Sequence, residues 1–152
     1  MPRVPRDPAP RARAGMAARG WTPGDFQRDV WAAQAAGQSG LLHATTGAGK
    51  TYAVWLGLLE RLAAAAPPAR APALTALWIT PMRALAADSA TALAAPLPDL
   101  APGWTLGLRT GDTASAERAR QDRRLPTALV TTPESLSLLL SRPEAATALG
   151  GV

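Results

Sequence analysis

The sequence predicts an α/β fold in which crossover helices cover a parallel β-sheet. Three observations support this prediction. Short apolar runs alternate along the chain with longer segments of helical character, as connected strands and crossover helices do. Two expected helices begin with proline directly after an apolar run, and proline is favoured at the first helical position. A glycine-rich segment, ATTGAGKT, joins the first apolar run to a long helical segment.

Strands and helices are expected to follow one another from residue 40 onward. The first 18 residues are proline, arginine and alanine with almost no large apolar side chain, so we expect a disordered basic arm before a domain over residues 19–152. The expected strands are residues 40–45, 73–80, 104–110 and 127–132, and the expected helices are residues 49–66, 81–95, 114–124 (a polar, exposed helix or turn) and 133–141.

Composition excludes several classes of protein. The chain has no cysteine and one histidine, so it offers neither a disulfide framework nor a zinc site. That residue, His43, is expected to pack in the core. Prolines, glycines and arginines interrupt every apolar run before it could cross a bilayer, and the basic N-terminus lacks the apolar segment of a secretory signal. We therefore expect a cytoplasmic protein without a membrane partner.

The segment ATTGAGKT has the spacing of a phosphate-binding loop. It differs from the pattern G-x-x-x-x-G-K-[ST] at its first position, where Ala44 replaces glycine. Gly47 and Gly49 would let backbone N–H groups turn toward an anion, and the following helix would add its partial positive charge. Lys50 is the only lysine among 16 lysines and arginines, and its compact ammonium suits the β- and γ-phosphates.

The loop therefore predicts a site for ATP and Mg²⁺. The hydroxyl of Thr51 would reach the Mg²⁺ that bridges the phosphates. The alternative is a plain glycine turn that caps a helix. Lys50 and Thr51 are the expected catalytic residues, and the loop residues expected to bind the nucleotide are Thr46, Gly47, Ala48, Gly49, Lys50 and Thr51.

Two residues upstream of the loop are candidates for contact with the adenine base. Gln27 presents both an amide donor and an acceptor, the pair needed to read the N6 and N7 edge of adenine. Trp21, six residues earlier, would pack on the base. The ordinary alternatives are a glutamine on a helix surface and a tryptophan in a core.

Five blocks occur in the order found in one helicase family. W-x-P-x-x-F-Q, ATTGAGKT, TPMRALAAD, RTGDTASAERAR and TTPESLSLLL together resemble the first motor domain of a superfamily 2 DExH-box helicase. The last two blocks are most similar to Lhr-type DNA helicases, and among them to the DNA ligase-associated DExH-box helicase. Over residues 20–152, the resemblance implies part of a RecA-like P-loop NTPase domain. It also implies ATP and Mg²⁺ as cofactors, single-stranded DNA as partner, and association with a DNA ligase or nuclease in DNA repair.

The resemblance also implies a set of residues that grip the backbone of a nucleic-acid strand. Each segment follows an expected strand, so hydroxyls and helix N-termini would gather along one sheet edge and hold phosphates without reading bases. TTPE is equally an ordinary capped helix start. The arginines of residues 118–124, with Arg109, are interpreted as a solvated face, a basic nucleic-acid surface being the alternative. The implied residues are Pro81, Arg83, Ala84, Thr110, Gly111, Asp112, Thr131, Thr132, Pro133 and Glu134.

The acidic D-E-x-H motif of these motors does not occur in the sequence. Such a motif holds Mg²⁺ and orients the attacking water. We therefore expect an N-terminal fragment of the first motor domain, cut before that motif, which binds nucleotide weakly and does not hydrolyse it alone. The alternatives are another nucleic-acid-dependent ATPase, such as an RNA helicase or a restriction translocase, and a non-catalytic nucleotide-binding module.

Overall fold

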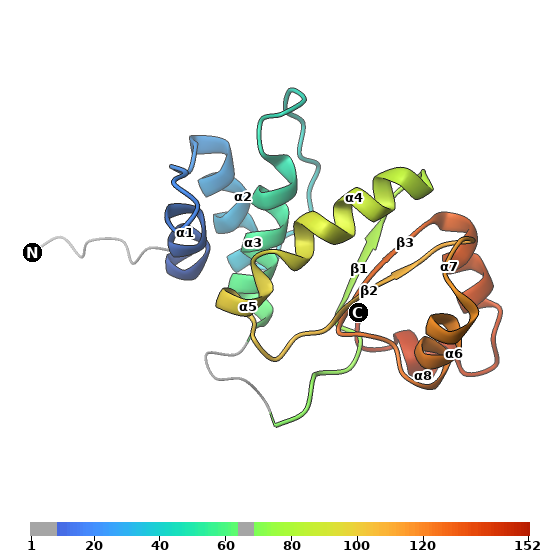
Figure 1. Cartoon of the computed structure of the whole chain (residues 1–152). Coiled ribbons are helices and arrows are strands. Elements are labelled where there is room, and N and C mark those ends of the chain that lie inside the picture. The colour runs from blue at the N-terminus through green and yellow to red at the C-terminus, as the bar shows by residue number, and fades with distance from the viewer. Residues whose placement is uncertain (1–8, 64–68) are drawn as a thin grey trace, which may run out of the picture. The chain divides into compact units, whose positions relative to one another are not determined.

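The structure, a computed structural model, describes residues 9–63 and 69–152 (Figure 1). The chain divides into two compact units. We call Met1–Ala65 with Asp99–Ala101 the N-terminal unit, and residues 66–98 with 102–152 the sheet unit. Among the described residues, no helix has the length and apolar character needed to span a membrane.

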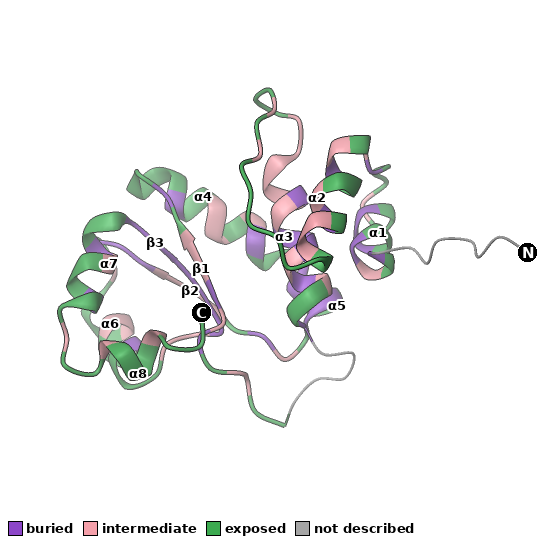
Figure 2. Ribbon diagram, turned by 180° about the vertical axis from the view of Figure 1, so that it is seen from behind, coloured by how far each residue is buried: buried purple, intermediate pink, exposed green. Residues whose placement is uncertain are grey.

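The N-terminal unit is helical. It contains α1 (Pro10–Ala17), α2 (Asp25–Ala35) and α3 (Lys50–Leu62). Helices α2 and α3 pack through Trp31, whose ring is buried and whose Nε1–H donates to the Ala53 carbonyl at 2.9 Å. Gln34, one turn further along α2, donates to the Val54 carbonyl at 3.1 Å. Trp55, Leu56 and Leu59 of α3 complete the buried interior; buried residues are drawn purple in Figure 2.

Helix α1 corrects the expectation of a disordered arm over residues 1–18, which is wrong for residues 10–17; residues 1–8 lie outside the described residues. Small side chains let α1 approach α3 closely, and Ala12 is fully buried. Arg11 donates to the Ala63 carbonyl at 2.6 Å and also to the Leu100 carbonyl. The Ala12 N–H donates to Glu60 Oε2 at 2.8 Å. Hydrogen bonds thus supply the anchoring that large apolar side chains would otherwise give.

The expected parallel sheet is confirmed in the sheet unit. It has three strands, β1 (Ala76–Ile79), β2 (Leu106–Arg109) and β3 (Ala128–Thr131), in the order β1-β3-β2. Both pairings are parallel, and β3 between them is buried along its whole length. Ile79 and Arg109 both lie opposite Thr131, so the three strands end at the same level.

Helices connect and flank these strands, with bounds close to those expected. Helix α4 begins at Arg83 with Met82 as its N-cap, so the expected place of Pro81 at the start of this helix is wrong. Helix α4 lies on one face of the sheet and α6 on the other, as right-handed crossovers in opposite directions require (Figures 1 and 2). Two short helices, α5 and α8, have no counterpart among the expected elements. The helices are α4 (Arg83–Ala94), α5 (Leu97–Leu100), α6 (Ser115–Arg123), α7 (Pro133–Leu140) and α8 (Ala145–Leu149).

The strand expected over residues 40–45 is wrong. These residues form no strand and are mostly exposed, with Leu41 94% exposed. His43 is exposed as well, which corrects its expected place in the core. A strand needs a neighbour to accept its ladder hydrogen bonds. The carbonyls of Ala44 and Thr45 instead accept hydrogen bonds from the Lys50 side chain.

Candidate nucleotide site and nucleic-acid edge

The ATTGAGKT loop curls because of two glycines. Gly47 has φ of 80° and Gly49 has φ of 84°, the left-handed region that side chains other than glycine rarely adopt. Gly49 is the N-cap of α3, which begins at Lys50. The first turn of α3 therefore presents its N–H groups and its partial positive charge beside the loop, the arrangement that binds phosphate in many proteins.

Lys50 turns back into the loop. Its Nζ donates to the carbonyls of Ala44 at 2.7 Å and Thr45 at 2.8 Å. These bonds hold the ammonium inside the curve of the loop, where phosphate oxygens are able to replace the carbonyls as acceptors. Thr51 follows on the first turn of α3 and is partly buried, as is Ala48, whereas Thr46 is exposed.

A pocket of about 650 Å³ lies beside this loop in the N-terminal unit. Its volume falls within the range of roughly 300–1,000 Å³ typical of small-molecule sites. The pocket brings together Trp21, Gln27 and the loop glycines, whereas Thr46, Lys50 and Thr51 are not part of its lining. The lining residues are Met16, Gly20, Trp21, Thr22, Gly24, Phe26, Gln27, Gly47, Ala48, Gly49 and Tyr52.

Sequence reasoning missed Tyr52 as a residue of this pocket. Its ring centroid lies 5.2 Å from that of Trp21, with the planes tilted by 53°. Such an edge-on contact is favourable between aromatic rings and fixes the half-exposed Trp21 against α3. The only sequence signal was the position of Tyr52 directly after Thr51.

Gln27 connects the pocket to the loop. It is 4% exposed, so the alternative of a glutamine on the helix surface is wrong. Its Oε1 accepts the N–H of Gly24, the N-cap of α2, at 2.9 Å, which satisfies one free donor at the start of that helix. Its Nε2 donates to the Gly49 carbonyl at 3.3 Å. A side-chain amide has two donors and two acceptor lone pairs, so Gln27 keeps one of each for a base.

We expect Gln27→Ala to weaken ATP binding about tenfold, the cost of two hydrogen bonds to a base. The variant should also lose most of its preference for ATP over GTP, because the amide pair matches adenine only. Titration with fluorescent ATP and GTP analogues measures both. Gln34→Ala is the matched control, since it removes a comparable side-chain hydrogen bond from α2 to the Val54 carbonyl of α3, outside the pocket. Equal losses in the two variants would assign Gln27 to folding alone.

The segments expected to hold a nucleic-acid strand do meet at one edge of the sheet. They follow the ends of β1, β2 and β3, and the register places these three ends side by side. Pro81, Arg83 and Ala84 are exposed there. A hollow of about 400 Å³ at this edge is lined by Arg83, Ala84, Ala87, Leu108, Thr110, Asp112 and Thr113.

Arg83 links the three segments electrostatically. Its Nη1 lies 2.8 Å from Asp112 Oδ1, and its guanidinium lies against Gly111. The pKa of Glu134 is lowered by the backbone N–H at the start of α7, by the Thr132 hydroxyl and by the charge of Arg83. A cation and two carboxylates from three different segments thus share this edge.

The predicted threonines are less available than their motifs suggest. Thr131 is fully buried and its hydroxyl donates to the Arg109 carbonyl at 2.8 Å. Thr132 is 2% exposed and stands at the N-cap of α7 with Pro133 at the first helical position, as the ordinary helix start predicts. The Thr110 hydroxyl accepts the Asp112 N–H at 3.3 Å. The side chains of these threonines therefore stabilise the backbone at this edge of the sheet and are not exposed on its surface.

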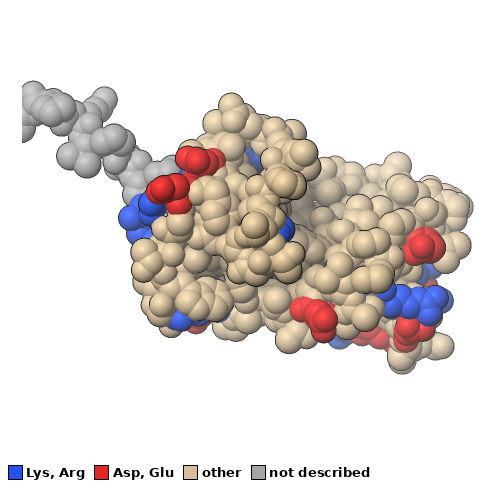
Figure 3. Space-filling model, turned by 90° about the horizontal axis from the view of Figure 1, so that it is seen from above, with Lys and Arg blue, Asp and Glu red and all other residues tan. Residues whose placement is uncertain are grey.

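Two arginines of α6 are held by neighbouring groups of the protein. Arg120 pairs with Glu117, and the pKa of Glu117 is lowered by this hydrogen bond and by one from Gln121. Arg118 points back to the loop after β2, and Arg109 is buried, which corrects its place on an exposed face. On the face shown in Figure 3, the Lys and Arg side chains lie in small groups, several of them next to Asp or Glu.

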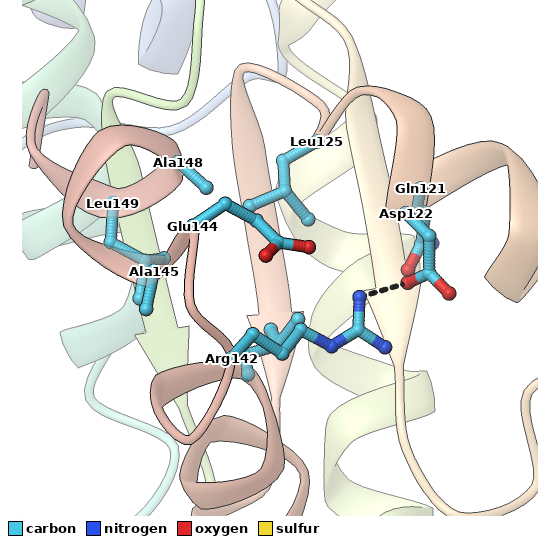
Figure 4. A pocket seen from close by; sticks show the side chains of 9 residues that line it. Gln121, Asp122, Leu125, Arg142, Glu144, Ala145, Ala148 and Leu149 are labelled. Carbon is cyan, nitrogen blue, oxygen red and sulfur yellow. Dashed lines mark hydrogen bonds and ion pairs between the residues drawn. The ribbon is translucent and has the colours of Figure 1, made fainter.

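The buried Arg109 belongs to an ion cluster that the sequence did not reveal, whose other members are partly exposed. Asp122 accepts from Arg109 at 2.7 Å and from Arg142 at 2.6 Å, and so ties β2 and α6 to the segment after α7. Figure 4 shows Arg142 reaching Asp122 across a cavity of about 30 Å³, with Leu125 and Glu144 beside it. This volume is far below that of a nucleotide-sized site, so we interpret the cluster as structural. The described residues contain no metal-binding group of three or more His, Cys, Asp or Glu.

Comparisons with known proteins agree with this geometry. Residues 24–150 match the model of the DEAD/DEAH box helicase family. The Lhr helicase/probable uracil glycosylase of Mycolicibacterium smegmatis is 38% identical over 131 residues, which cover 78% of this chain and 8% of that protein. The ATP-dependent helicase Lhr-Core of Sulfolobus acidocaldarius is 36% identical over 116 residues, which cover 71% of this chain and 13% of that protein.

A solved structure extends the similarity to three dimensions. The structure of Mycobacterium smegmatis helicase Lhr bound to single-stranded DNA and AMP-PNP matches 96% of this chain and 20% of its own chain, with a TM-score of 0.82 and 32% identity. The expected similarity to Lhr helicases and the α/β fold of part of a RecA-like helicase domain are confirmed, whereas the ligase-associated branch stays a prediction. The chain spans only 8% and 13% of the two curated relatives. Since the family model covers most of its length, the chain belongs to the DEAD/DEAH box helicase family.

Proposed function

We propose that this chain is the ATP-binding part of an ATP-dependent DNA helicase or translocase. The observation that carries the proposal is the joined arrangement in the N-terminal unit, where one glycine loop holds Lys50 and the same loop is bonded to Gln27. The loop glycines and Gln27 line one pocket, and Lys50 lies on the same loop just outside it. The chain's similarity to a helicase solved with AMP-PNP supports a nucleotide as its ligand.

Each residue of the nucleotide site has a role in this proposal. Trp21 packs on the base and Gln27 reads its edge. The loop N–H groups and Lys50 hold the phosphates, and the hydroxyl of Thr51 faces the Mg²⁺ bound to them. A Mg²⁺ ion held there would supply positive charge beside the phosphates. The residues present suit Mg²⁺ bound as a complex with the nucleotide, since the loop then needs to supply only one oxygen ligand, the Thr51 hydroxyl.

The edge formed by the ends of β1, β2 and β3 is the proposed contact with one strand of DNA. Arg83 and the N-terminus of α7 there suit phosphates, and contacts of this kind carry no sequence information. The single-stranded DNA in the similar Lhr structure supports DNA as the partner. The RTGDT and TTPESL blocks support a place in the ligase-associated branch, and with it a role in DNA repair beside a DNA ligase or nuclease. The composition, without cysteine, supports a place in the cytoplasm.

Binding to labelled oligo(dT), oligo(dA) and oligo(rU), measured by fluorescence anisotropy, tests the DNA part of the proposal. We expect similar affinity for the two DNA sequences and weaker affinity for RNA. The logarithm of the association constant should fall linearly with the logarithm of salt concentration, because phosphate contacts release counterions. Tighter binding to RNA would favour the RNA helicase alternative. Absence of binding to all three would leave a nucleotide-binding module.

A further inference from the structure

Asp112 stands on a braced loop at the nucleic-acid edge. The Thr110 N–H donates to Thr113 Oγ1 at 2.9 Å, and the Asp112 N–H donates to Thr110 Oγ1. From α6, Arg118 Nη2 donates to the carbonyls of Gly111 at 3.2 Å and Thr113 at 3.3 Å. The loop is therefore held from inside and from α6, and it carries the Asp112 carboxylate at a fixed place.

The partner of this carboxylate is the exposed guanidinium of Arg83. The two side chains are 63% and 68% exposed and meet at 2.8 Å. Gly111 permits the approach, since a Cβ atom there would lie 2.8 Å from Arg83 Nη2. An exposed pair of this kind contributes little to folding, about 0–1 kcal/mol. Its geometry therefore calls for a reason other than stability.

We propose that Asp112 is a positioning residue that acts on DNA through Arg83; this inference rests on the function proposed above. A carboxylate repels a phosphate and has no hydrogen to donate to it. A guanidinium has five donors in a planar fork, so it binds Asp112 along one edge and keeps another for a phosphate. Asp112 thereby selects, among the many rotamers of Arg83, the one that faces the DNA strand. This refines the expectation that Asp112 itself touches the nucleic acid.

Removing the carboxylate distinguishes a positioning role from plain repulsion, because the two roles predict opposite changes in the affinity for oligo(dT). If Asp112 only repelled phosphates, Asp112→Ala would tighten binding to oligo(dT), since it removes a negative charge from a chain of net charge +5. If Asp112 positions Arg83, the same variant binds more weakly despite the more favourable charge. Asp88→Ala, an exposed carboxylate on α4, is the matched control for charge alone.

The experiment measures oligo(dT) binding by the full chain and its variants at several salt concentrations. We expect Arg83→Ala to weaken binding about tenfold, as the loss of a charged hydrogen bond to phosphate does. Asp112→Ala should weaken it about threefold, and Asp88→Ala should leave it unchanged or slightly tighter. In the Arg83→Ala background, Asp112→Ala should cause no further loss, because residues acting through one another are not additive. Thermal unfolding confirms that each variant is folded.

Three outcomes overturn parts of this picture and are distinguishable. Equal or tighter binding by Asp112→Ala, with weaker binding by Arg83→Ala, overturns the positioning role and leaves the proposed edge intact. If Asp112→Ala weakens binding in the Arg83→Ala background as much as it does in the unchanged chain, Asp112 acts without Arg83, and the positioning role is overturned as well. Unchanged binding by Arg83→Ala overturns the proposed edge itself and the inference with it.

Discussion

Replacing Lys50 by alanine is expected to lower the affinity of the chain for Mg-ATP about 100-fold, the equivalent of losing one strong charged hydrogen-bonding group. The thermal stability of the N-terminal unit should change little. A positive charge at the first residue of α3 opposes the helix dipole, so its removal relieves roughly 0.3–1 kcal/mol. This gain offsets part of the loss of the two hydrogen bonds to loop carbonyls, of which one is part-buried and one is exposed. A large loss of binding with a small change in stability identifies a ligand-directed residue.

Two matched variants sharpen this test. Lys50→Arg keeps the charge but replaces a compact ammonium with a wide planar fork, and we expect it to bind Mg-ATP nearly as poorly as Lys50→Ala. Arg61→Ala removes a basic residue from the last turn of the same helix and should leave binding unchanged. Isothermal titration with a non-hydrolysable ATP analogue measures all three. If Lys50→Ala bound the analogue as the unchanged chain does, the segment would be a glycine turn that caps a helix.

Local patterns predicted the parts of the fold whose causes are local. The glycine loop, the proline at the start of α7 and the apolar runs of β1, β2 and β3 each depend on residues next to one another in sequence. Helix α1 depends on partners far away, since Arg11 reaches Ala63 and Leu100. The strand expected over residues 40–45 had the right composition, but composition does not supply a neighbouring strand. Both predictions, the disordered arm and the strand over residues 40–45, were wrong because the outcome depends on long-range contacts.

The same distinction applies to the candidate site. The motif order placed Gln27 and the loop at one pocket and gathered Arg83, Asp112 and Glu134 at one sheet edge. Sequence alone did not show that Asp112 faces Arg83. The packing of α6 against β2 decides which arginine is solvated, which is buried and which holds a loop. No local sequence pattern encodes that packing.

The second large effect is expected at Asp122, where Asp122→Asn should destabilise the sheet unit. The Arg109 side chain is 6% exposed, and without the carboxylate it would be a buried cation with a weak partner. Breaking a fully buried pair costs about 3–5 kcal/mol. Because the Asp122 side chain is 35% exposed, solvent screens part of this, and we expect a loss of about 2 kcal/mol. Glu117→Gln on the same helix is the control, and we expect it to leave the stability nearly unchanged, because exposed ion pairs contribute little.

The pH dependence of this loss follows from the pKa of Asp122. The Arg142 guanidinium, together with Arg109, holds that pKa below its ordinary value of 3.8 and raises the pKa of Arg142 in turn. A carboxyl group whose pKa is lowered by folding stabilises the folded state above its unfolded pKa. That contribution is lost as pH falls through the folded pKa, because the unfolded state then gains the proton first.

The difference in stability between the unchanged chain and Asp122→Asn should therefore be constant near neutral pH and shrink as pH falls below 3.8. Hydrogen exchange of the β3 backbone amides at a series of pH values measures it within the sheet unit, where those amides are buried at the centre of the sheet. A difference that stayed constant to the lowest pH would mean that the aspartate contributes shape and not charge. A difference near zero at neutral pH would mean that Arg109 finds another acceptor when Asp122 is neutralised.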